Sequence, residues 1–81
     1  MRGLLRGKIL YMIYVRIKEL RKENGLTQQQ VADAIGKKRE VYRRYESGER
    51  KLRTEILIAL AEFYDVSTDY ILGMTDERKR H

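Results

Sequence analysis

The sequence predicts an all-α fold, a compact bundle of five short helices in a single domain. Three observations favour this class. The 81 residues contain no proline, and helix-forming side chains recur throughout. Apolar residues repeat at helical spacing, as in Ile13, Ile17 and Leu20. Breaks that contain glycine or asparagine divide the pattern, which indicates several short helices. A chain of this length buries only a modest core.

The first helix is predicted over about 13–24, where Asn24-Gly25 ends it. The residues before it, 1–12, are expected to form an N-terminal extension whose first eight residues are loosely held. The apolar run 9–15 is too short to span a membrane and has no cleavage site of small residues. Arg16 follows it directly, so we expect a cytoplasmic protein without a membrane partner.

The segment 27–48 predicts two helices around a tight turn. Thr27 is a suitable N-cap, and Gln30, three residues on, completes a capping box. Gly36 supplies a left-handed stop between the helices, and Gly48 ends the second one. The two helices are expected over about 28–35 and 38–46. Two short helices joined by a glycine turn have the form of a helix-turn-helix, a DNA-reading motif.

Two more helices complete the predicted bundle, and each has a candidate cap. Thr54 is expected to open the fourth helix after a basic loop, and Ser67 to open the fifth after an Asp65-Val66 turn. These helices are expected over about 54–64 and 68–73. The predicted divisions of the chain are the extension 1–12, the helix-turn-helix domain 13–74 and a polar tail 75–81.

Positive charge is concentrated in the same motif. The formal net charge is +6, and the segment from Lys37 to Arg53 contains eight cationic and three anionic residues. A basic stripe confined to one motif is typical of a polyanion partner. The alternative is a charged face that is merely solvated.

The composition argues against catalysis and metal binding. The chain has no cysteine, and its one histidine, His81, reads as a solvated end residue. The carboxylates that we assign to solvent show no paired arrangement; they are Asp33, Glu55, Glu62 and Asp65. We therefore expect no enzyme, no metal site, no cofactor and no small-molecule ligand.

Three segments carry a resemblance to a known family: LTQQQVADAIG, VYRRYESGER and ILIALAEFYDVSTDYILG. In this order and spacing the chain resembles the Xre/Cro-type helix-turn-helix family, the DNA-binding domain of lambdoid phage repressors. The resemblance implies a lambda repressor-like fold over about residues 13–74. The sequence departs from the pattern of this family at Lys37, Lys38 and Leu52-Arg53. Lys38 replaces the usual Ser or Thr cap of the third helix, which weakens its start by about 1 kcal/mol.

In this family the start of the third helix enters the major groove. That position implies four side chains at base edges: Lys38, Arg39, Glu40 and Arg44. Arg39 is the main candidate, because a bidentate arginine on guanine is the commonest specific contact. Glu40 has an alternative role in an i,i+4 ion pair with Arg44. Tyr42 and Tyr45 are expected in the core and not on bases.

A second set of side chains is expected at DNA phosphates: Thr27, Gln28, Arg43, Ser47, Arg50 and Lys51. Gln28 lies where free helix amides favour an anion, and the family places a phosphate contact there. Gln28 and Arg43 could instead be solvated surface side chains. Ser47 could instead be only the turn residue that ends its helix. The resemblance also implies an ion pair between Arg21 and Glu46 that fixes the third helix on the first.

The leading hypothesis is a sequence-specific double-stranded DNA-binding transcriptional regulator, a repressor that binds a palindromic operator as a homodimer. The alternative is an antitoxin-like or anti-repressor protein that docks a partner through residues 9–15. A small RNA-binding protein is disfavoured by the lack of an aromatic stacking platform. Two dimer surfaces compete, the fifth-helix side near Val66, Tyr70 and Met74, and the apolar strip 9–15.

Overall fold

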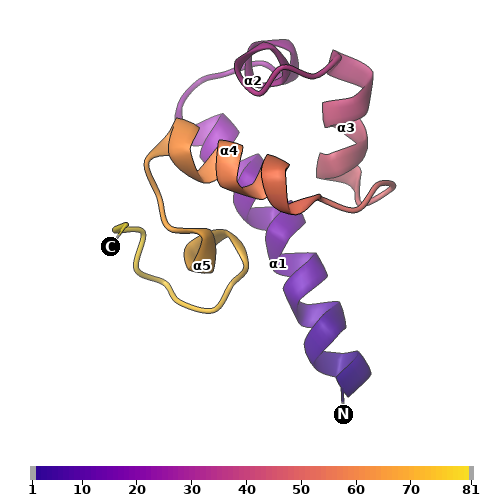
Figure 1. The fold of residues 1–81 in the computed structure, drawn as a ribbon, viewed down its shortest axis with the longest axis vertical. Coiled ribbons are helices and arrows are strands. Elements are labelled where there is room, and N and C mark those ends of the chain that lie inside the picture. The colour runs from indigo at the N-terminus through magenta and orange to yellow at the C-terminus, as the bar shows by residue number, and fades with distance from the viewer. Residues whose placement is uncertain (1, 81) are drawn as a thin grey trace.

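The structure is a computed structural model that describes residues 2–80, with side chains from residue 7 onward. Within that range the chain forms five helices and no strand, which confirms the all-α prediction. The helices, shown in Figure 1, are α1 (Arg2–Glu23), α2 (Gln28–Ala34), α3 (Arg39–Ser47), α4 (Thr54–Tyr64) and α5 (Thr68–Ile71). The terminal His81, predicted to be a solvated end, lies outside the described residues.

Helix α1 is longer than the sequence analysis predicted. The expected start near residue 13 is wrong, because α1 runs unbroken from Arg2 to Glu23. The division of the chain into an extension 1–12 and a domain 13–74 stays a prediction. The C-terminal half is packed in the core, and adding turns to a formed helix is far easier than starting one, despite Gly3 and Gly7. In Figure 1 the N-terminal half of α1 projects beyond the other helices.

The core takes fully buried side chains from every helix. One such residue from each of the five helices is Ile17, Val31, Tyr42, Leu60 and Ile71, all with 0% exposure. Burying an apolar side chain of this size is worth about 1.5–3 kcal/mol. Tyr45 is also buried, so the prediction that the two tyrosines of α3 pack in the core is confirmed.

The turn between α2 and α3 has the predicted glycine geometry. Gly36 adopts a φ of 70°, and the Lys37 N–H donates to the Ala32 carbonyl oxygen at 2.9 Å. Ala32 is fully buried, and its small side chain lets α3 pack closely across α2. The helix-turn-helix form is therefore present, with α2 as the first helix and α3 as the second.

The caps of the last two helices differ from each other. Ser67 caps α5 as predicted, because its Oγ accepts a hydrogen bond from the Tyr70 N–H at 3.0 Å. The predicted cap at Thr54 is wrong, since Arg53 is the N-cap and makes no side-chain cap bond. The Arg53 carbonyl oxygen accepts from the N–H of Leu57 at 2.9 Å, as an N-cap carbonyl does, and α4 itself covers 54–64 as expected.

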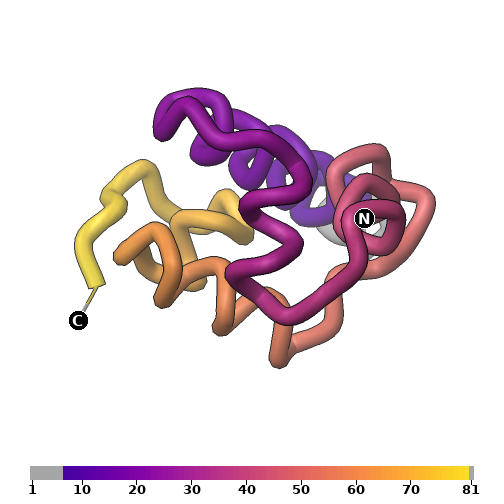
Figure 2. Tube along the Cα trace, turned by 90° about the horizontal axis from the view of Figure 1, so that it is seen from above, coloured from indigo at the N-terminus to yellow at the C-terminus, as the bar shows by residue number. Residues whose placement is uncertain are grey.

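The C-terminal tail folds back on α1 and α5 instead of extending freely. Asp76 accepts a hydrogen bond from Arg16 at 2.9 Å, and Arg78 pairs with Glu23 at 2.8 Å. Arg16 is buried and lies 4.0 Å from the ring centroid of Tyr70. Figure 2 shows the yellow tail beside the end of α1. The sequence predicted a polar tail but none of these contacts.

The structure also revises the two predicted dimer surfaces. Val66 and Tyr70 are 4% and 5% exposed, so on the α5 side only Met74, at 67%, presents a large apolar side chain. On α1, Tyr11 is exposed and Ile9 is partly exposed. No helix in the described part of the chain is long and apolar enough to cross a membrane.

Candidate nucleic-acid interface

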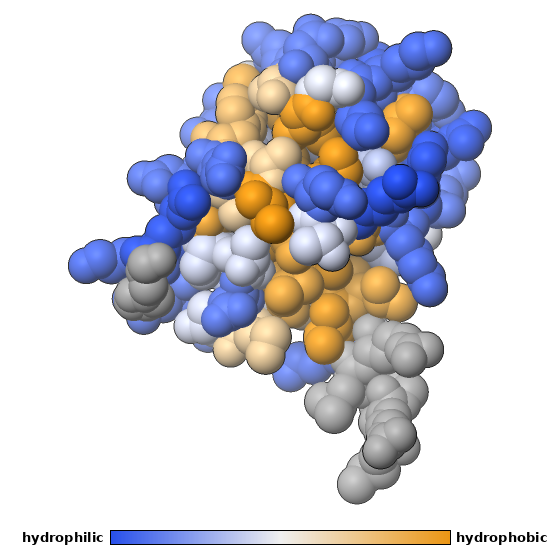
Figure 3. Space-filling view, in the orientation of Figure 1, coloured by the Kyte–Doolittle hydropathy of each residue, from blue (hydrophilic) through white to orange (hydrophobic). Residues whose placement is uncertain are grey.

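The outer face of α3 is charged and exposed. Its inner face carries Tyr42, Tyr45 and Glu46, all buried, with Val41 packed against the core beside them. The four side chains predicted at base edges, Lys38, Arg39, Glu40 and Arg44, are all exposed. In Figure 3 hydrophilic side chains cover the top and right of the molecule, over α2 and α3, whereas apolar ones gather lower down.

Lys38 and Arg39 present free cationic ends. Among the side chains that the structure describes, neither takes part in an ion pair. Lys38 is the N-cap of α3 with extended backbone angles (φ −73°, ψ 148°) and no side-chain cap bond, as expected. The first amides of α3 therefore lack a capping side chain, and both cations lie beside them.

Glu40 lies in an ion-pair cluster on the same face. Its Oε1 is 2.8 Å from Arg43 Nη2 and 3.7 Å from Arg44 Nε. The predicted alternative pair with Arg44 is thus the looser contact, and Arg43 is the main partner. The Arg43 hydrogen bond holds the pKa of the Glu40 carboxyl below its usual range. Arg43 is also 2.8 Å from Glu49 Oε2, a contact that the sequence analysis missed.

A groove of about 300 Å³ runs beside α3, between α1 and the start of α2. It is lined by Lys18, Arg21, Lys22, Gln28, Arg43, Glu46 and Ser47. Four of these side chains are cationic and one is a carboxylate, so the groove favours an anion. It brings together the predicted phosphate contacts Gln28, Arg43 and Ser47, which come from two different helices.

Two lysines of this groove, Lys18 and Lys22, were missed by the sequence analysis. Their i,i+4 spacing on α1 puts them on one helix face, and this signal is visible in the sequence. The pattern could not show which element that face meets. The packing of α3 and the start of α2 against the end of α1 brings them to the groove.

The floor of the groove is a partly buried ion pair. Arg21 Nε lies 2.6 Å from Glu46 Oε2, and Arg21 Nη2 lies 3.1 Å from Glu46 Oε1. The side chains are only 14% and 4% exposed. Arg21 also donates to the Leu26 carbonyl oxygen, and Gln28 Nε2 donates to Glu46 Oε1 at 3.3 Å. One pair thus joins α1, α2 and α3, as the resemblance implied for Arg21 and Glu46.

Burial and hydrogen bonding act in opposite directions on this pair. Burial raises the pKa of Glu46, but the hydrogen bonds from Arg21 and Gln28 outweigh it and leave that pKa lowered. The hydrogen bond to Glu46 raises the pKa of Arg21. Burial next to this carboxylate raises the pKa of Tyr64 to about 12. Arg21 and Glu46 are therefore charged, and Tyr64 neutral, at neutral pH.

The start of α2 has the predicted capping box. Thr27 Oγ1 accepts from the Gln30 N–H at 3.1 Å, and the Thr27 N–H donates to Gln30 Oε1 at 2.8 Å. The Thr27 hydroxyl therefore holds the helix end. Gln28 is half-buried and lies at the mouth of the groove. A phosphate role for either residue remains a prediction.

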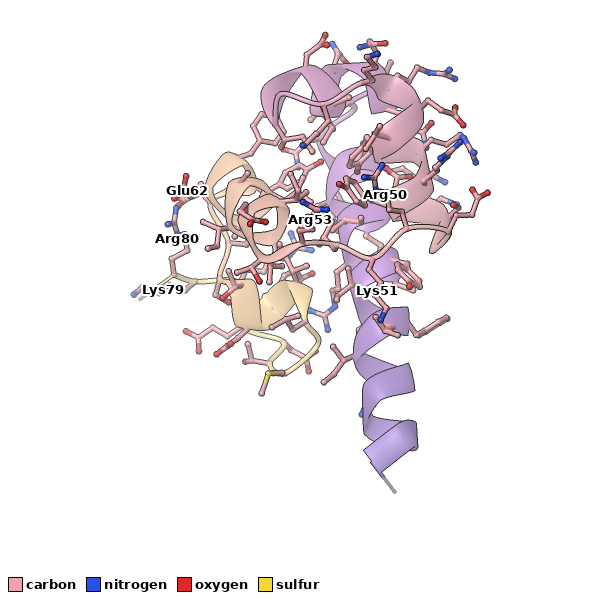
Figure 4. All side chains as sticks on the ribbon, turned by 45° about the vertical axis from the view of Figure 1, so that its right-hand side comes forward. Arg50, Lys51, Arg53, Glu62, Lys79 and Arg80 are labelled. Carbon is pink, nitrogen blue, oxygen red and sulfur yellow. The ribbon has the colours of Figure 1, made fainter. Side chains whose placement is uncertain are left out.

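The loop after α3 carries the last predicted phosphate contacts. Ser47 Oγ donates to Glu49 Oε2 at 2.7 Å, and Arg50 and Lys51 are exposed. Figure 4 shows Arg50 and Lys51 on different sides of this loop, followed by Arg53 at the start of α4. The loop leaves α3 through Gly48, whose φ is 82°. These cations therefore extend the charged face of α3 toward α4.

Residues 17–71 match the helix-turn-helix family model over more than half of the chain. The chain belongs to the Xre/Cro-like helix-turn-helix family. This membership confirms the resemblance, and the five-helix structure is consistent with a lambda repressor-like fold.

Three relatives from Bacillus subtilis (strain 168) are similar to the chain. It is 45% identical over 62 residues to the uncharacterized HTH-type transcriptional regulator YobD, covering 76% of this chain and 55% of that protein. It is 36% identical over 64 residues to the HTH-type transcriptional regulator AnsR, covering 79% and 55%. It is 35% identical over 66 residues to the HTH-type transcriptional regulator ImmR, covering 82% and 52%. The chain spans about half the length of these curated relatives.

Proposed function

We propose that this chain is the sequence-specific, double-stranded DNA-binding unit of a transcription regulator. One observation carries the proposal: the start of α3 is exposed and cationic, and a cationic groove that three helices build lies beside the C-terminal half of the same helix. A protruding helix with free arginines suits the major groove, and a flanking anion site suits the backbone. The regulator relatives support the same function, and none of their names describes an enzyme.

Within this proposal the side chains divide into two groups. Arg39 and Lys38 read base edges, because they project from α3 and are free of intramolecular ion pairs among the described side chains. Glu40 and Arg44 contribute to the same readout. The phosphate contacts come from both sides of α3 and are Lys18, Lys22, Thr27, Gln28, Arg43, Ser47, Arg50 and Lys51. Phosphate contacts set the orientation, and base contacts set the preference.

A comparison of two substitutions tests this division. Duplex sites are first selected from a random pool, and affinities are then measured by fluorescence anisotropy on a selected and a random duplex. Arg39→Ala should cost about 1–3 kcal/mol on the selected site and little on random DNA. Lys51→Ala should weaken binding to both and reduce the salt slope by about one.

Lys79→Ala is the matched control, since Lys79 is an exposed lysine in the tail on the far side of α4 (Figure 4). It should leave both affinities unchanged. If Arg39→Ala lowers both affinities equally, the readout role is wrong. If the wild-type chain selects no duplex at all, the competing prediction of an antitoxin-like or anti-repressor partner gains support.

The regulatory mode is a second part of the proposal. One recognition helix reads only a few base pairs, so we infer a repressor that binds inverted half-sites as a homodimer. A two-fold axis would set the two α3 helices about 34 Å apart, one turn of DNA. The exposed large apolar side chains available for the contact are Ile9, Tyr11, Ile58, Phe63 and Met74. Footprinting should show two protections about ten base pairs apart, and full affinity of one copy for a single half-site would rule the dimer out.

A further inference from the structure

Glu49 binds two of the side chains that the proposed function assigns to DNA phosphates. Its Oε2 lies 2.8 Å from Arg43 Nη1 and accepts a hydrogen bond from Ser47 Oγ at 2.7 Å. The Glu49 N–H also donates to Ser47 Oγ at 3.4 Å. A single carboxylate oxygen therefore receives an arginine and a hydroxyl at the same time.

This arrangement has the chemistry of a phosphate contact. Backbone phosphate oxygens in protein–DNA complexes accept hydrogen bonds mainly from arginine, lysine and hydroxyl side chains. A charged carboxylate oxygen between a guanidinium and a hydroxyl accepts the same kind of charge-assisted bond. The hydrogen bonds from Ser47 and Arg43 hold the pKa of the Glu49 carboxyl below its usual range, so the group is anionic at neutral pH.

Arg43 is held from both sides in this cluster. Glu40 lies 2.8 Å from its Nη2, and Glu49 lies 2.8 Å from its Nη1. With Arg44 3.7 Å from Glu40, the cluster holds two carboxylates and two guanidinium groups, and the charge of Arg43 is neutralised within it. In this state Arg43 adds no attraction for DNA, although it lines the groove beside α3.

The cluster is also free to open. The side chain of Glu49 is 55% exposed, and the residue follows Gly48 in the loop outside α3. Arg43 is itself 37% exposed. Rotation of the Glu49 side chain away from α3 therefore disturbs no core residue.

We propose that Glu49 is a specificity-determining residue that occupies a phosphate position intramolecularly, so that Arg43 and Ser47 turn to DNA only on a matched site. The inference rests on the proposed function and names a regulating residue of the same interface. On random DNA nothing holds α3 in register, and the carboxylate keeps both donors. On a matched site the base contacts hold α3 in place, and a phosphate displaces Glu49. Glu49 thus lowers the affinity for random DNA more than that for the matched site.

Glu49→Gln tests this directly, because the amide keeps the size and loses the charge. Affinities for a selected and a random duplex are measured at several salt concentrations. We expect the affinity for random DNA to rise about five- to tenfold and its salt slope to steepen by about one, as Arg43 becomes available. The affinity for the selected duplex should rise less, so the ratio of the two falls. An unchanged melting temperature would verify that the variant folds.

Glu55→Gln is the matched control for the loss of one negative charge. Glu55 is an exposed glutamate six residues further on, in the first turn of α4. It should change the two affinities by the same small factor. The effect of Glu49→Gln should also nearly vanish in an Arg43→Ala background, because its main partner is then missing.

The outcomes separate this inference from the proposed function. If the wild-type chain prefers the selected duplex but Glu49→Gln leaves the affinity ratio unchanged, only the role of Glu49 is overturned. The same holds if Glu49→Gln acts equally strongly with and without Arg43, since the effect is then general electrostatics. If the wild-type chain binds no duplex DNA, both proposals fail.

Discussion

The two helices of the helix-turn-helix begin in opposite ways. Helix α2 starts with a complete capping box between Thr27 and Gln30, contains no cation and buries Val31 and Ala32. Helix α3 starts at Lys38 without a side-chain cap and carries three arginines. The first helix is stable by its local sequence, whereas the second exposes charge at its start where a stabilising cap would otherwise lie. The difference fits the proposed division of roles, in which α2 supports the fold and α3 contacts DNA.

Tertiary contacts compensate for the weak start of α3. Tyr42 and Tyr45 are buried against the core, and Glu46 is bound by Arg21 from α1. The contacts lie toward the middle and C-terminal end of the helix, beyond Lys38, Arg39 and Glu40 at its start. The start of α3 can therefore vary in sequence without loss of the fold.

The largest expected effect is the loss of the Arg21–Glu46 pair. Glu46→Ala leaves the Arg21 guanidinium partly buried without its partner, and we expect it to lower the free energy of unfolding by about 3–5 kcal/mol. Urea denaturation of Arg21→Ala, Glu46→Ala and the double mutant measures the coupling. Additive effects would mean that no functional pair holds α3 to α1.

The chain offers a matched control for this pair. Arg78 and Glu23 make the same two-bond contact at 2.8 and 2.9 Å, but their side chains are 48% and 46% exposed. Breaking that pair should cost about 0–1 kcal/mol. Equal losses for both pairs would show that burial does not decide their strength.

The acid stability should report on the same pair. The folded-state pKa of Glu46 lies below its ordinary value of 4.5, because the hydrogen bonds from Arg21 and Gln28 outweigh burial. Its contribution is therefore complete above pH 4.5 and is lost as the pH falls through the folded pKa. Thermal melts between about pH 7 and pH 2 should show a steeper loss for the wild type than for Glu46→Gln. Parallel curves would contradict a lowered pKa.

The two glycines that end these helices provide the next comparison. Gly36 and Gly48 have φ values of 70° and 82°, so alanine costs about 1–2 kcal/mol at either position. A Cβ at Gly48 would also lie 2.7 Å from Tyr14 Cε2, whereas one at Gly36 meets nothing within 4 Å. Gly48→Ala should therefore be the more destabilising, by about 1 kcal/mol or more in urea denaturation. Equal urea midpoints for the two variants would show that the Tyr14 ring moves aside for the added Cβ without cost.

The smallest expected effects concern the two caps. Thr27→Ala removes the capping box of α2 and should cost about 1 kcal/mol. Lys38→Ser adds a cap to α3 and should raise the free energy of unfolding by up to about 1 kcal/mol, while it weakens DNA binding. Calorimetry measures the stability of each variant, and fluorescence anisotropy on the same samples measures its affinity for DNA. A destabilised Lys38→Ser variant would contradict the view that α3 lacks a cap.

The elements whose causes lie within one helical turn were predicted well. The capping box at Thr27, the stop at Gly36 and the cap at Ser67 are present as expected, because each is a contact between residues three or four apart. The cap expected at Thr54 was wrong by one residue. The start of α1 was wrong by more, since its extension depends on a packed C-terminal half that local composition does not reveal.

The candidate site was predicted only in part for a related reason. The charged residues of α3 could be identified from composition and from the family. Their partners could not, because Glu40 has two arginines within reach along α3 and Glu49 lies beyond the helix end. The groove lysines Lys18 and Lys22 were also missed, since a charged helix face looks the same whether it meets solvent or a neighbouring helix.

The sequence by itself determined the helix count, the glycine turn, the inward tyrosines and the concentration of cations on α3. These follow from periodicity and capping, which act over a few neighbouring residues. Only the tertiary structure decided which long side chains meet. Arg21 contacts Glu46 across 25 residues of chain, and Arg16 contacts Asp76 across 60. Such contacts depend on how packed helices bring distant segments within about 3 Å, a distance that no local pattern encodes.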